Sequence, residues 1–540
     1  MKNGLAAGGT ALLLISLAAC GSNRDNNGDG GNGASSTGGS FTLGTTDTVT
    51  AVDPAGSYDL GSSTLQYSIF QTLLTIPAGA TTPEGDAAQS CSYDDPQTLT
   101  CKLKPDLKFS NGDALTSSDV KFSFERMLGI GDPNGAAIYL LGDIAKTAKD
   151  GTVTGLDPKA IETPDDSTVI FHLNRPDVTF QFILTYPGSG AIVDEQVFPA
   201  DKKLADDAVI GSGPYKLSQY KAGQQAVLEA NASYSGDREP KASPVYISYY
   251  QEASALKLAV ESGEIDVAWD TLGPTDITAL KSNSDVTVAE GDGAAIRYWV
   301  WQNASGPGKD LAVRQAAAQI IDRAAIAKTA YEDTVTPLYS IVPPGLPGQT
   351  DSFKTTYGDA PDVAAAKKML SDAGIATPVK ITMGYTPTHY GPTTVDEATE
   401  FSRELEGSGL FTVDLKSAEW EQYQTIYKQG AYDVWILGWY PDYLDPDDYL
   451  SPFLVDGGFF ENGYHSDKAN QLVSEELAST NSATRIADFK KLQDLAAKDV
   501  PFIPSWVGNN TAVYRAGMNG IEDTLDPAYI FRLWTITKSS

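Results

Sequence analysis

Residues 433–450, DVWILGWYPDYLDPDDYL, run from an apolar strand directly into a group of acids. Residues 434–437 are bulky and apolar, which is typical of a strand inside a protein core. Four aspartates and four aromatic residues follow. Because ligands of open α/β sheets bind beyond the ends of strands, the stretch indicates a functional site, for which binding, catalysis and metal coordination are the alternatives.

Strand-like segments and amphipathic helices alternate on both sides of this stretch, which predicts an α/β fold. Thr116 or Ser117 can cap a helix that carries Asp119 in its first turn. Another helix is expected at about 253–262, where Gly263 would end it. The roughly 520 residues after the N-terminal segment are too many for one core, so two or three sub-domains are expected.

The N-terminal segment has the pattern of an export signal. Residues 1–19 carry a single lysine and a short apolar run, and LAAC places Cys20 where a bacterial lipoprotein carries its lipid. We predict that residues 1–19 are removed and that Cys20 is lipidated; a plain secretory signal with a coincidental cysteine is the alternative. Residues 20–40, rich in Gly, Asn and Ser, predict a flexible linker.

Composition narrows the possible partners. A net charge of -31 would repel nucleic acids. No segment after the signal is apolar for long enough to cross a membrane. Cys91 and Cys101 lie in CSYDDPQTLTC, whose DDP is turn chemistry between two short strands. Outside the cytoplasm they are expected to form a disulfide; a metal or catalytic pair is the alternative, but no histidine is near in sequence.

Five stretches together resemble the solute-binding proteins of ABC importers of the peptide, nickel and dipeptide class, known as family 5. They occur in the order of that family across nearly the whole chain after the signal. The stretches are KLKPDLKFSNGDALTSSDVKFSFERM (102–127), GSGPYKL (211–217), LKLAVESGEIDVAW (256–269), VRQAAAQIIDR (313–323) and YDVWILGWYPDYLDPDDYLSPFL (432–454).

The resemblance implies a periplasmic-binding-protein-like fold of two lobes, with mixed sheets flanked by helices and the ligand between the lobes. Two β crossings would form a hinge. The first lobe would contain a main domain from three separate segments and an inserted domain, and the second lobe would be continuous. The expected ranges are 41–80, 196–290 and 506–540 for the main domain, 81–195 for the insert and 291–505 for the second lobe.

The resemblance also implies a site in the opening stretch. In peptide-binding members, an aspartate three residues after the tryptophan of the motif holds the α-ammonium of the peptide, and that position is Asp442. Gly438, Trp439 and Tyr440 would lie where the backbone pairs with an extended peptide. The chemistry agrees, because a desolvated ammonium needs a countercharge and a fixed carboxylate provides it.

Other positions are expected to contact the ligand on the same resemblance. Residues 62–70, SSTLQYSIF, would form the first-lobe strand that pairs with the peptide, through the backbone of Ser63, Thr64 and Leu65. Tyr139 matches a ligand-contacting tyrosine of some oligopeptide binders, with a core aromatic as the alternative. The arginine of dipeptide-specific members before the helix near Thr393 is absent here, and His389 is a candidate to contact a ligand carboxylate.

The acidic stretch has three competing interpretations. Acid–base catalysis would need carboxylates of split pKa, and calcium binding would need the glycine and glutamate of an EF-hand loop. A solvated acidic turn, in which Asp445 or Asp447 caps the next helix, is the interpretation we adopt for Asp445, Asp447 and Asp448. No metal site and no cofactor is expected, because the three histidines are scattered.

We therefore expect a monomeric, lipid-anchored receptor on the extracytoplasmic face of the cell membrane. It would bind oligopeptides and pass them to ABC permease subunits with cytoplasmic ATPases, without catalysing a reaction. An oligosaccharide, haem or a metal chelate is the alternative cargo, and Trp439, Tyr440 and Trp299 would suit a sugar. A secreted hydrolase is a third hypothesis, but no G-x-S-x-G, H-E-x-x-H or Cys/His pattern supports it.

Overall fold

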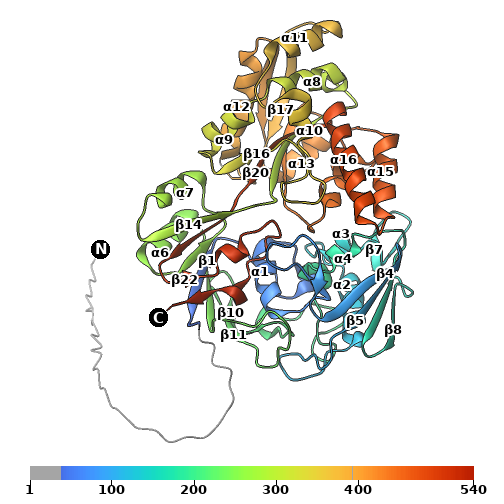
Figure 1. Ribbon diagram of the computed structural model, residues 1–540, viewed down its shortest axis with the longest axis vertical. Helices are drawn as coiled ribbons and strands as arrows, with labels where there is room; N and C mark the ends of the chain where they lie inside the picture. Colours follow the sequence, from blue (N-terminus) through green and yellow to red (C-terminus); the bar gives the residue numbers. More distant parts are fainter. Residues whose placement is uncertain (1–37, 392, 540) are drawn as a thin grey trace, which may run out of the picture. The chain divides into compact units, whose positions relative to one another are not determined.

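The computed structural model describes residues 38–391 and 393–539 (Figure 1). The expected signal peptide and Cys20 lie outside these residues. Within them, mixed sheets are flanked by helices, as the sequence predicts. None of the described helices combines the length and the apolar character that a membrane span requires.

A seven-stranded mixed sheet is assembled from distant parts of the chain. Strand β1 is parallel to both of its neighbours, β12 and β13, whereas the other pairs are antiparallel. In spatial order the strands are β10 (Tyr215–Lys221), β11 (Gln225–Ala230), β12 (Val245–Tyr249), β1 (Phe41–Thr45), β13 (Val267–Trp269), β21 (Asn510–Arg515) and β14 (Val286–Gly291).

A six-stranded mixed sheet holds the opening stretch of the sequence analysis. Its strand β15 is central, with an antiparallel neighbour on each side, and every residue of β15 is buried. A strand buried on both faces reads as a nearly continuous apolar run rather than an alternating one, and in β15 only Arg297 interrupts that run. In spatial order the strands are β16 (Val335–Pro337), β20 (Phe502–Gly508), β15 (Ile296–Trp301), β19 (Val434–Trp439), β17 (Val379–Tyr385) and β18 (Phe411–Ser417).

The chain passes between these two sheets twice, from β14 to β15 and from β20 to β21. The two passages contact each other, since the Gly508 N–H donates to the Ala295 carbonyl at 2.8 Å. A Cβ on Gly293 would overlap the Gly508 carbonyl oxygen, so this close approach requires glycine. Strand β20 runs to Gly508, so the expected domain boundary at 506 falls inside a strand of the six-stranded sheet.

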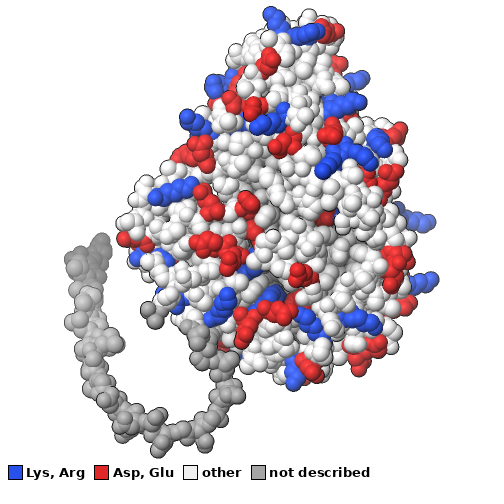
Figure 2. Space-filling model, in the orientation of Figure 1, with Lys and Arg blue, Asp and Glu red and all other residues white. Residues whose placement is uncertain are grey.

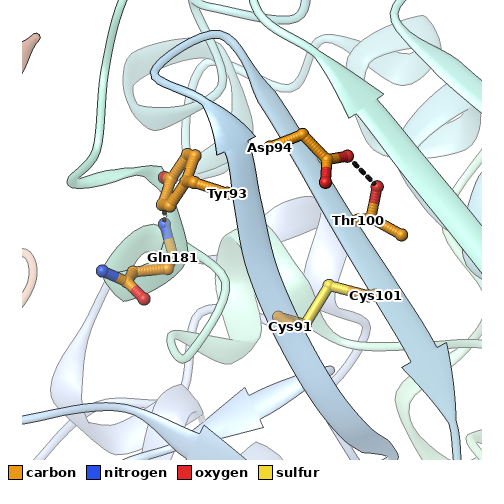
Figure 3. Close-up of a disulfide and its surroundings, with 6 residues drawn as sticks. All are labelled: Cys91, Tyr93, Asp94, Thr100, Cys101 and Gln181. Carbon is orange, nitrogen blue, oxygen red and sulfur yellow. Dashed lines mark hydrogen bonds between the residues drawn. A yellow bond between two sulfur atoms is a disulfide. The ribbon is translucent and has the colours of Figure 1, made fainter. Parts of the chain in front are cut away.

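A separate antiparallel sheet lies in the segment expected to be the insert. Its order is β4 (Ala88–Asp95), β5 (Thr98–Leu103), β9 (Thr168–His172) and β8 (Ile161–Asp165). Cys91 and Cys101 are directly opposite in the β4–β5 hairpin and form a disulfide, as predicted (Figure 3). Thr100 also bonds Asp94 across the hairpin, at 2.8 Å.

Reduction of this disulfide should lower the free energy of unfolding by about 2–3 kcal/mol, because the unfolded chain regains the freedom of the closed loop. Urea denaturation of the protein with and without a reductant measures the difference. The double variant Cys91→Ser/Cys101→Ser is the control, and a reductant should not affect it further. Equal unfolding midpoints for the oxidised and reduced native protein would contradict the prediction.

The helices cover the sheets and begin and end at local signals. Asp119 accepts from the Thr116 N–H at 2.8 Å at the start of α2, and α6 is followed by Gly263 at φ 80°, so both predicted helices are confirmed. The longer helices are α2 (Ser117–Ile130), α6 (Ala253–Ser262), α7 (Pro274–Lys281), α8 (Leu311–Ile320), α9 (Arg323–Tyr331), α11 (Val363–Asp372), α12 (Thr393–Gly407), α13 (Trp420–Lys428), α15 (Asp467–Leu477) and α16 (Ser482–Asp499). The last two pack side by side (Figure 1).

The strand expected at residues 62–70 is wrong, because this segment lies in helix α1 (Leu60–Ile69). Asp59 begins the helix by accepting from the Ser62 N–H at 2.7 Å. Residues 61–69 are buried on every side of the helix. A helix that is enclosed all round has no polar stripe, so its sequence does not show the helical period.

The surface carries both kinds of charge. Acidic and basic side chains are interspersed on the face that Figure 2 shows. The net charge of -31 nevertheless makes the chain strongly acidic, which favours solubility and disfavours polyanionic partners.

Candidate functional site

Asp442 lies in the loop after β19 and faces the segment that precedes α1. It lines a cavity of about 60 Å³ together with Ser63, Tyr186 and Tyr529, which come from chain segments far from it in sequence. Tyr58 donates a hydrogen bond to Asp442 Oδ1. The carboxylate is thus half-buried at a junction between the six-stranded sheet and the first segment of the chain, rather than on the outer surface.

The charge of Asp442 has no cationic partner among the described residues. No lysine or arginine nitrogen of residues 38–391 or 393–539 lies within 4.0 Å of its carboxylate. Burial raises the pKa of Asp442 to about 6, although the hydrogen bond from Tyr58 lowers it. A cation placed here would stabilise the ionised form of this carboxylate.

Asp448 fixes the surroundings of Asp442. It is fully buried, and it accepts hydrogen bonds from Trp439 Nε1 at 3.0 Å and from the Asp442 N–H at 3.1 Å. Burial and the nearby Asp442 charge raise the pKa of Asp448 well above its usual value. Asp448 therefore holds the Asp442 backbone and the Trp439 ring in place from behind the cavity, which Asp442 alone of the two lines.

The acidic turn is not solvated, contrary to the sequence interpretation. Asp445, Asp447 and Asp448 are all buried. Arg485 donates to both oxygens of Asp445, at 2.7 and 2.9 Å, and to Glu476 at 2.9 Å, so an ion-pair cluster compensates the burial. The predicted cap is confirmed, because Asp445 accepts from the Asp447 N–H at the start of the short helix η4 (Pro446–Tyr449).

Asp447 bonds neutral partners instead of cations. Tyr443 donates to its Oδ2 at 2.7 Å and Ser451 donates to its Oδ1. Within the described part of the chain, no group of three or more His, Cys, Asp or Glu side chains could hold a metal ion. The four aspartates of the stretch therefore divide into separate roles, of which only Asp442 lines the small cavity.

The end of β19 leaves part of a strand edge unpaired. Strand β17 pairs with β19 only at Val434 and Trp435, so residues 436–439 have no strand partner on that side among the described strands. Tyr440, which follows, is 55% exposed and its ring lies 6.0 Å from that of Tyr529. Ile436 and Leu437 are buried and Tyr423 donates to the Ile436 carbonyl at 2.7 Å, so only the partly exposed Gly438 and Trp439 can present this edge to an extended chain.

Tyr139 is close to this region and is not a core aromatic. Its side chain is 60% exposed, and its ring stacks on Tyr58 with centroids 5.8 Å apart. It also lines a cavity of about 770 Å³ beside Arg175, Tyr443 and Asp447. The alternative of a buried tyrosine is therefore wrong. The Tyr139 ring is separated from the Asp442 carboxylate by Tyr58, which contacts both.

The backbone route proposed for Ser63, Thr64 and Leu65 is not available. The Ser63 N–H donates to the Asp59 carbonyl, Thr64 Oγ1 donates to the Leu60 carbonyl, and Leu65 is fully buried. A helix uses its amides internally, so these residues cannot add a peptide strand. Of these three residues, Ser63 alone lines the Asp442 cavity.

The structure leaves the role of His389 a prediction, whereas that of Trp299 differs from expectation. His389 stacks on Trp420 at 3.8 Å, and burial together with the charge of Arg297 lowers its pKa to about 4. A neutral ring would contact a ligand carboxylate through a hydrogen bond and not through an ion pair. Trp299 is fully buried in the six-stranded sheet and is not available as a platform for a sugar.

Sequence reasoning missed a larger cavity of about 460 Å³ that shares Tyr529 with the Asp442 cavity. Its lining comes from both large sheets and includes Asp270, Arg297 and Tyr440. Arg297 belongs to β15, IRYWVW, and is only 6% exposed. A single arginine inside an otherwise aromatic and apolar strand is the signal that could have revealed it.

The comparisons with known proteins decide the family. The family model described as bacterial extracellular solute-binding proteins, family 5 middle, matches residues 82–461. The chain belongs to this family. The predicted membership of the chain in family 5 is therefore confirmed.

Two curated relatives and one solved structure show the extent of the similarity. The chain is 27% identical over 488 residues to the probable D,D-dipeptide-binding periplasmic protein DdpA of Escherichia coli, covering 87% of each chain. It is 24% identical to the periplasmic oligopeptide-binding protein OppA of Salmonella typhimurium, covering 90% of this chain and 91% of OppA.

The solved structure is the periplasmic binding protein DppA from Helicobacter pylori in complex with peptide STSA. The TM-score is 0.73 at 20% identity, and the match covers 93% of this chain and 99% of that one. At this identity the likeness concerns the fold, and it confirms the two-lobed architecture of family 5 for this chain.

Proposed function

We propose that this family 5 protein captures peptides at Asp442 and delivers them to an ABC importer. The observation that carries the proposal is a desolvated carboxylate without a cationic partner in the described chain, located between the two large parts of the fold. The α-ammonium of a peptide is a cation that fits this position. An ammonium and a carboxylate that lose water together must pair, and this requirement gives the site its selectivity.

The neighbouring groups support an extended peptide. The partly exposed end of the β19 edge, at Gly438 and Trp439, would offer backbone groups, which bind a peptide regardless of its side chains. Gly438, Trp439 and Tyr440 border this edge, and Tyr139 borders Asp442 through Tyr58. The relatives named above for dipeptides and oligopeptides support the same class of cargo.

The rest of the proposal concerns the place of the protein in transport. Lipidation of Cys20 would hold the monomer at the extracytoplasmic face of the membrane, and the linker would let it reach the permease subunits. Binding would favour the closed arrangement, because only there does the ligand contact both lobes. No bond chemistry is needed for this role.

Mass spectrometry of the ligands that co-purify with the protein from its native host tests the function. We expect peptides with free amino termini. Recovery of oligosaccharides, haem or metal chelates instead, with no peptide, would overturn the proposal and support the alternative cargoes. Turnover of bound peptides by the purified protein would instead revive the hydrolase hypothesis.

Peptide affinity should fall as the pH falls below about 6, because part of the empty protein then carries a protonated Asp442. An ammonium binds the ionised form, so binding must release a proton, and affinity should fall by up to about tenfold per pH unit. Calorimetry at pH 5 and 7.5, in buffers of different ionisation enthalpy, measures both effects. The Asp442→Asn variant should show less proton release, and an unchanged release would assign it to another group such as Asp448.

A further inference from the structure

The Arg297 guanidinium is buried without a countercharge. It is 6% exposed, its Nε has no hydrogen-bond partner, and no carboxylate of the described residues lies within 4.0 Å of it. Other buried arginines pair with carboxylates, among them Arg126 with Asp53, Arg238 with Asp86 and Arg485 with Asp445. Arg314 and Arg323 have no carboxylate partner either, but they donate to backbone carbonyls. A buried charge without a partner is unfavourable, so the position of Arg297 needs a cause.

The surroundings hold the guanidinium in one position. Its carbon lies 3.9 Å from the centre of the Tyr390 ring and 4.9 Å from that of Trp506. On the neighbouring strand it lies against Gly438, where a Cβ would overlap Nη1. The buried Glu397 interacts with the charge of Arg297 but already accepts hydrogen bonds from Tyr331, Ser505 and Trp506. The side chain is therefore fixed by aromatic contacts and by the absence of a side chain opposite it.

The same guanidinium borders the cavity of about 460 Å³. Tyr529 lines both that cavity and the Asp442 cavity, so the two cavities are neighbours. Arg297 is paired in register with Gly438, four positions before Asp442. Four residues of extended chain span at most about 14 Å, so the backbone of Gly438 and that of Asp442 lie no farther apart than this. The limit also restricts the length of a ligand that is held at both anchors.

We infer that Arg297 binds the carboxylate of a short peptide of no more than about four residues whose ammonium lies at Asp442. The inference rests on the proposed function and adds the second anchor and the length limit. A planar guanidinium whose Nε has no partner suits a carboxylate, which it can bind with two parallel hydrogen bonds. This anchor replaces the arginine that is missing before α12.

Asp270 is the acidic group on the wall of the same cavity, and Asp47 is its acidic neighbour, whose pKa is raised to about 7 by burial and by Asp270. Asp270 is not within ion-pair distance of Arg297. Burial raises the pKa of Asp270, which reduces its repulsion of a ligand carboxylate. The cavity therefore keeps a net preference for an anionic group at Arg297.

A peptide pool tests the inference. Randomised peptides of two to six residues are prepared with both ends free, with acetylated amino termini, and with amidated carboxyl termini. Each pool is equilibrated with the purified protein and with Arg297→Gln, and the retained peptides are quantified by mass spectrometry. We expect the native protein to prefer free over amidated peptides by about tenfold or more, mainly at lengths up to four, and the variant to lose this preference.

The outcomes separate the inference from the function on which it rests. Retention of free and amidated peptides alike, with acetylated ones rejected, would overturn the role of Arg297 and leave that of Asp442. Retention of no peptide in any form would overturn both. A preference for free acids that persists in Arg297→Gln would place the carboxylate elsewhere, and amidated peptides rich in Asp or Glu that still need Arg297 would identify a side-chain carboxylate as the group bound.

Two further variants control for loss of structure. Arg297→Lys keeps the charge but loses the paired donors, so part of the preference for free acids should return. Arg323→Gln removes another buried arginine, which contacts the Tyr339 ring and the Pro504 carbonyl but does not line the cavity. It should leave the preference unchanged, and thermal unfolding of each variant shows that the folded protein is being compared.

Discussion

Asp442→Asn should weaken binding of a retained peptide by about 2–5 kcal/mol, or roughly 30- to 5,000-fold in Kd. The amide keeps the size of the side chain and can still accept the hydrogen bond from Tyr58, so the loop should stay folded. It cannot supply the negative charge that compensates a desolvated ammonium. Isothermal titration calorimetry with the native protein and the variant measures the loss.

The decisive comparison uses the same peptide with its amino terminus acetylated. The native protein should lose affinity for the acetylated peptide to a similar extent, and acetylation should have little further effect on Asp442→Asn. Asp414→Asn is a matched control, because Asp414 is exposed on β18 and pairs with Lys416. If the native protein binds both peptides equally, Asp442 does not hold the amino terminus.

Arg485→Met should lower the free energy of unfolding by about 3–5 kcal/mol, the largest stability effect that we expect. The change leaves Asp445 and Glu476 buried without their common partner. The change also removes the contact that holds Asp445, the residue that caps η4. Helix η4 carries Asp448, which bonds the Asp442 N–H, so peptide binding at Asp442 should weaken as well. Urea denaturation gives the first quantity and calorimetry the second.

Arg403→Met is the matched control for that variant. The Arg403 side chain is 66% exposed and pairs with Glu400 within one helix, so its loss should change the free energy of unfolding by less than about 1 kcal/mol. An Arg485→Met protein as stable as the native one would show that the cluster is replaceable by apolar packing. Unchanged peptide affinity would show that η4 is held by other contacts.

Local signals in the sequence predicted the elements that depend on neighbouring residues. The buried strand before Asp442 and the helix that ends at Gly263 follow from short-range pattern and backbone conformation. The same reasoning failed at α1, because a helix enclosed on all sides shows no period. The disulfide was predictable, since its two cysteines face each other across a single turn.

The site was harder to predict, because its properties depend on residues far apart in the chain. Asp445 is buried because Arg485 approaches it from α16, and nothing near Asp445 in sequence announces that partner. The cavity of about 460 Å³ brings Asp270, Arg297 and Tyr529 together from three segments. The family resemblance located Asp442, whereas no comparable pattern identified Arg297.

The contact between Arg297 and Gly438 has an evolutionary consequence. Any larger residue at position 438 would displace the guanidinium, whereas a chain without that arginine would have no such restriction. We therefore expect the two positions to covary among homologues, with glycine retained wherever the arginine is present. A lineage that changes its cargo would be expected to relax both positions together, so a pairwise count of these two alignment columns would indicate which relatives share the proposed preference for a carboxylate.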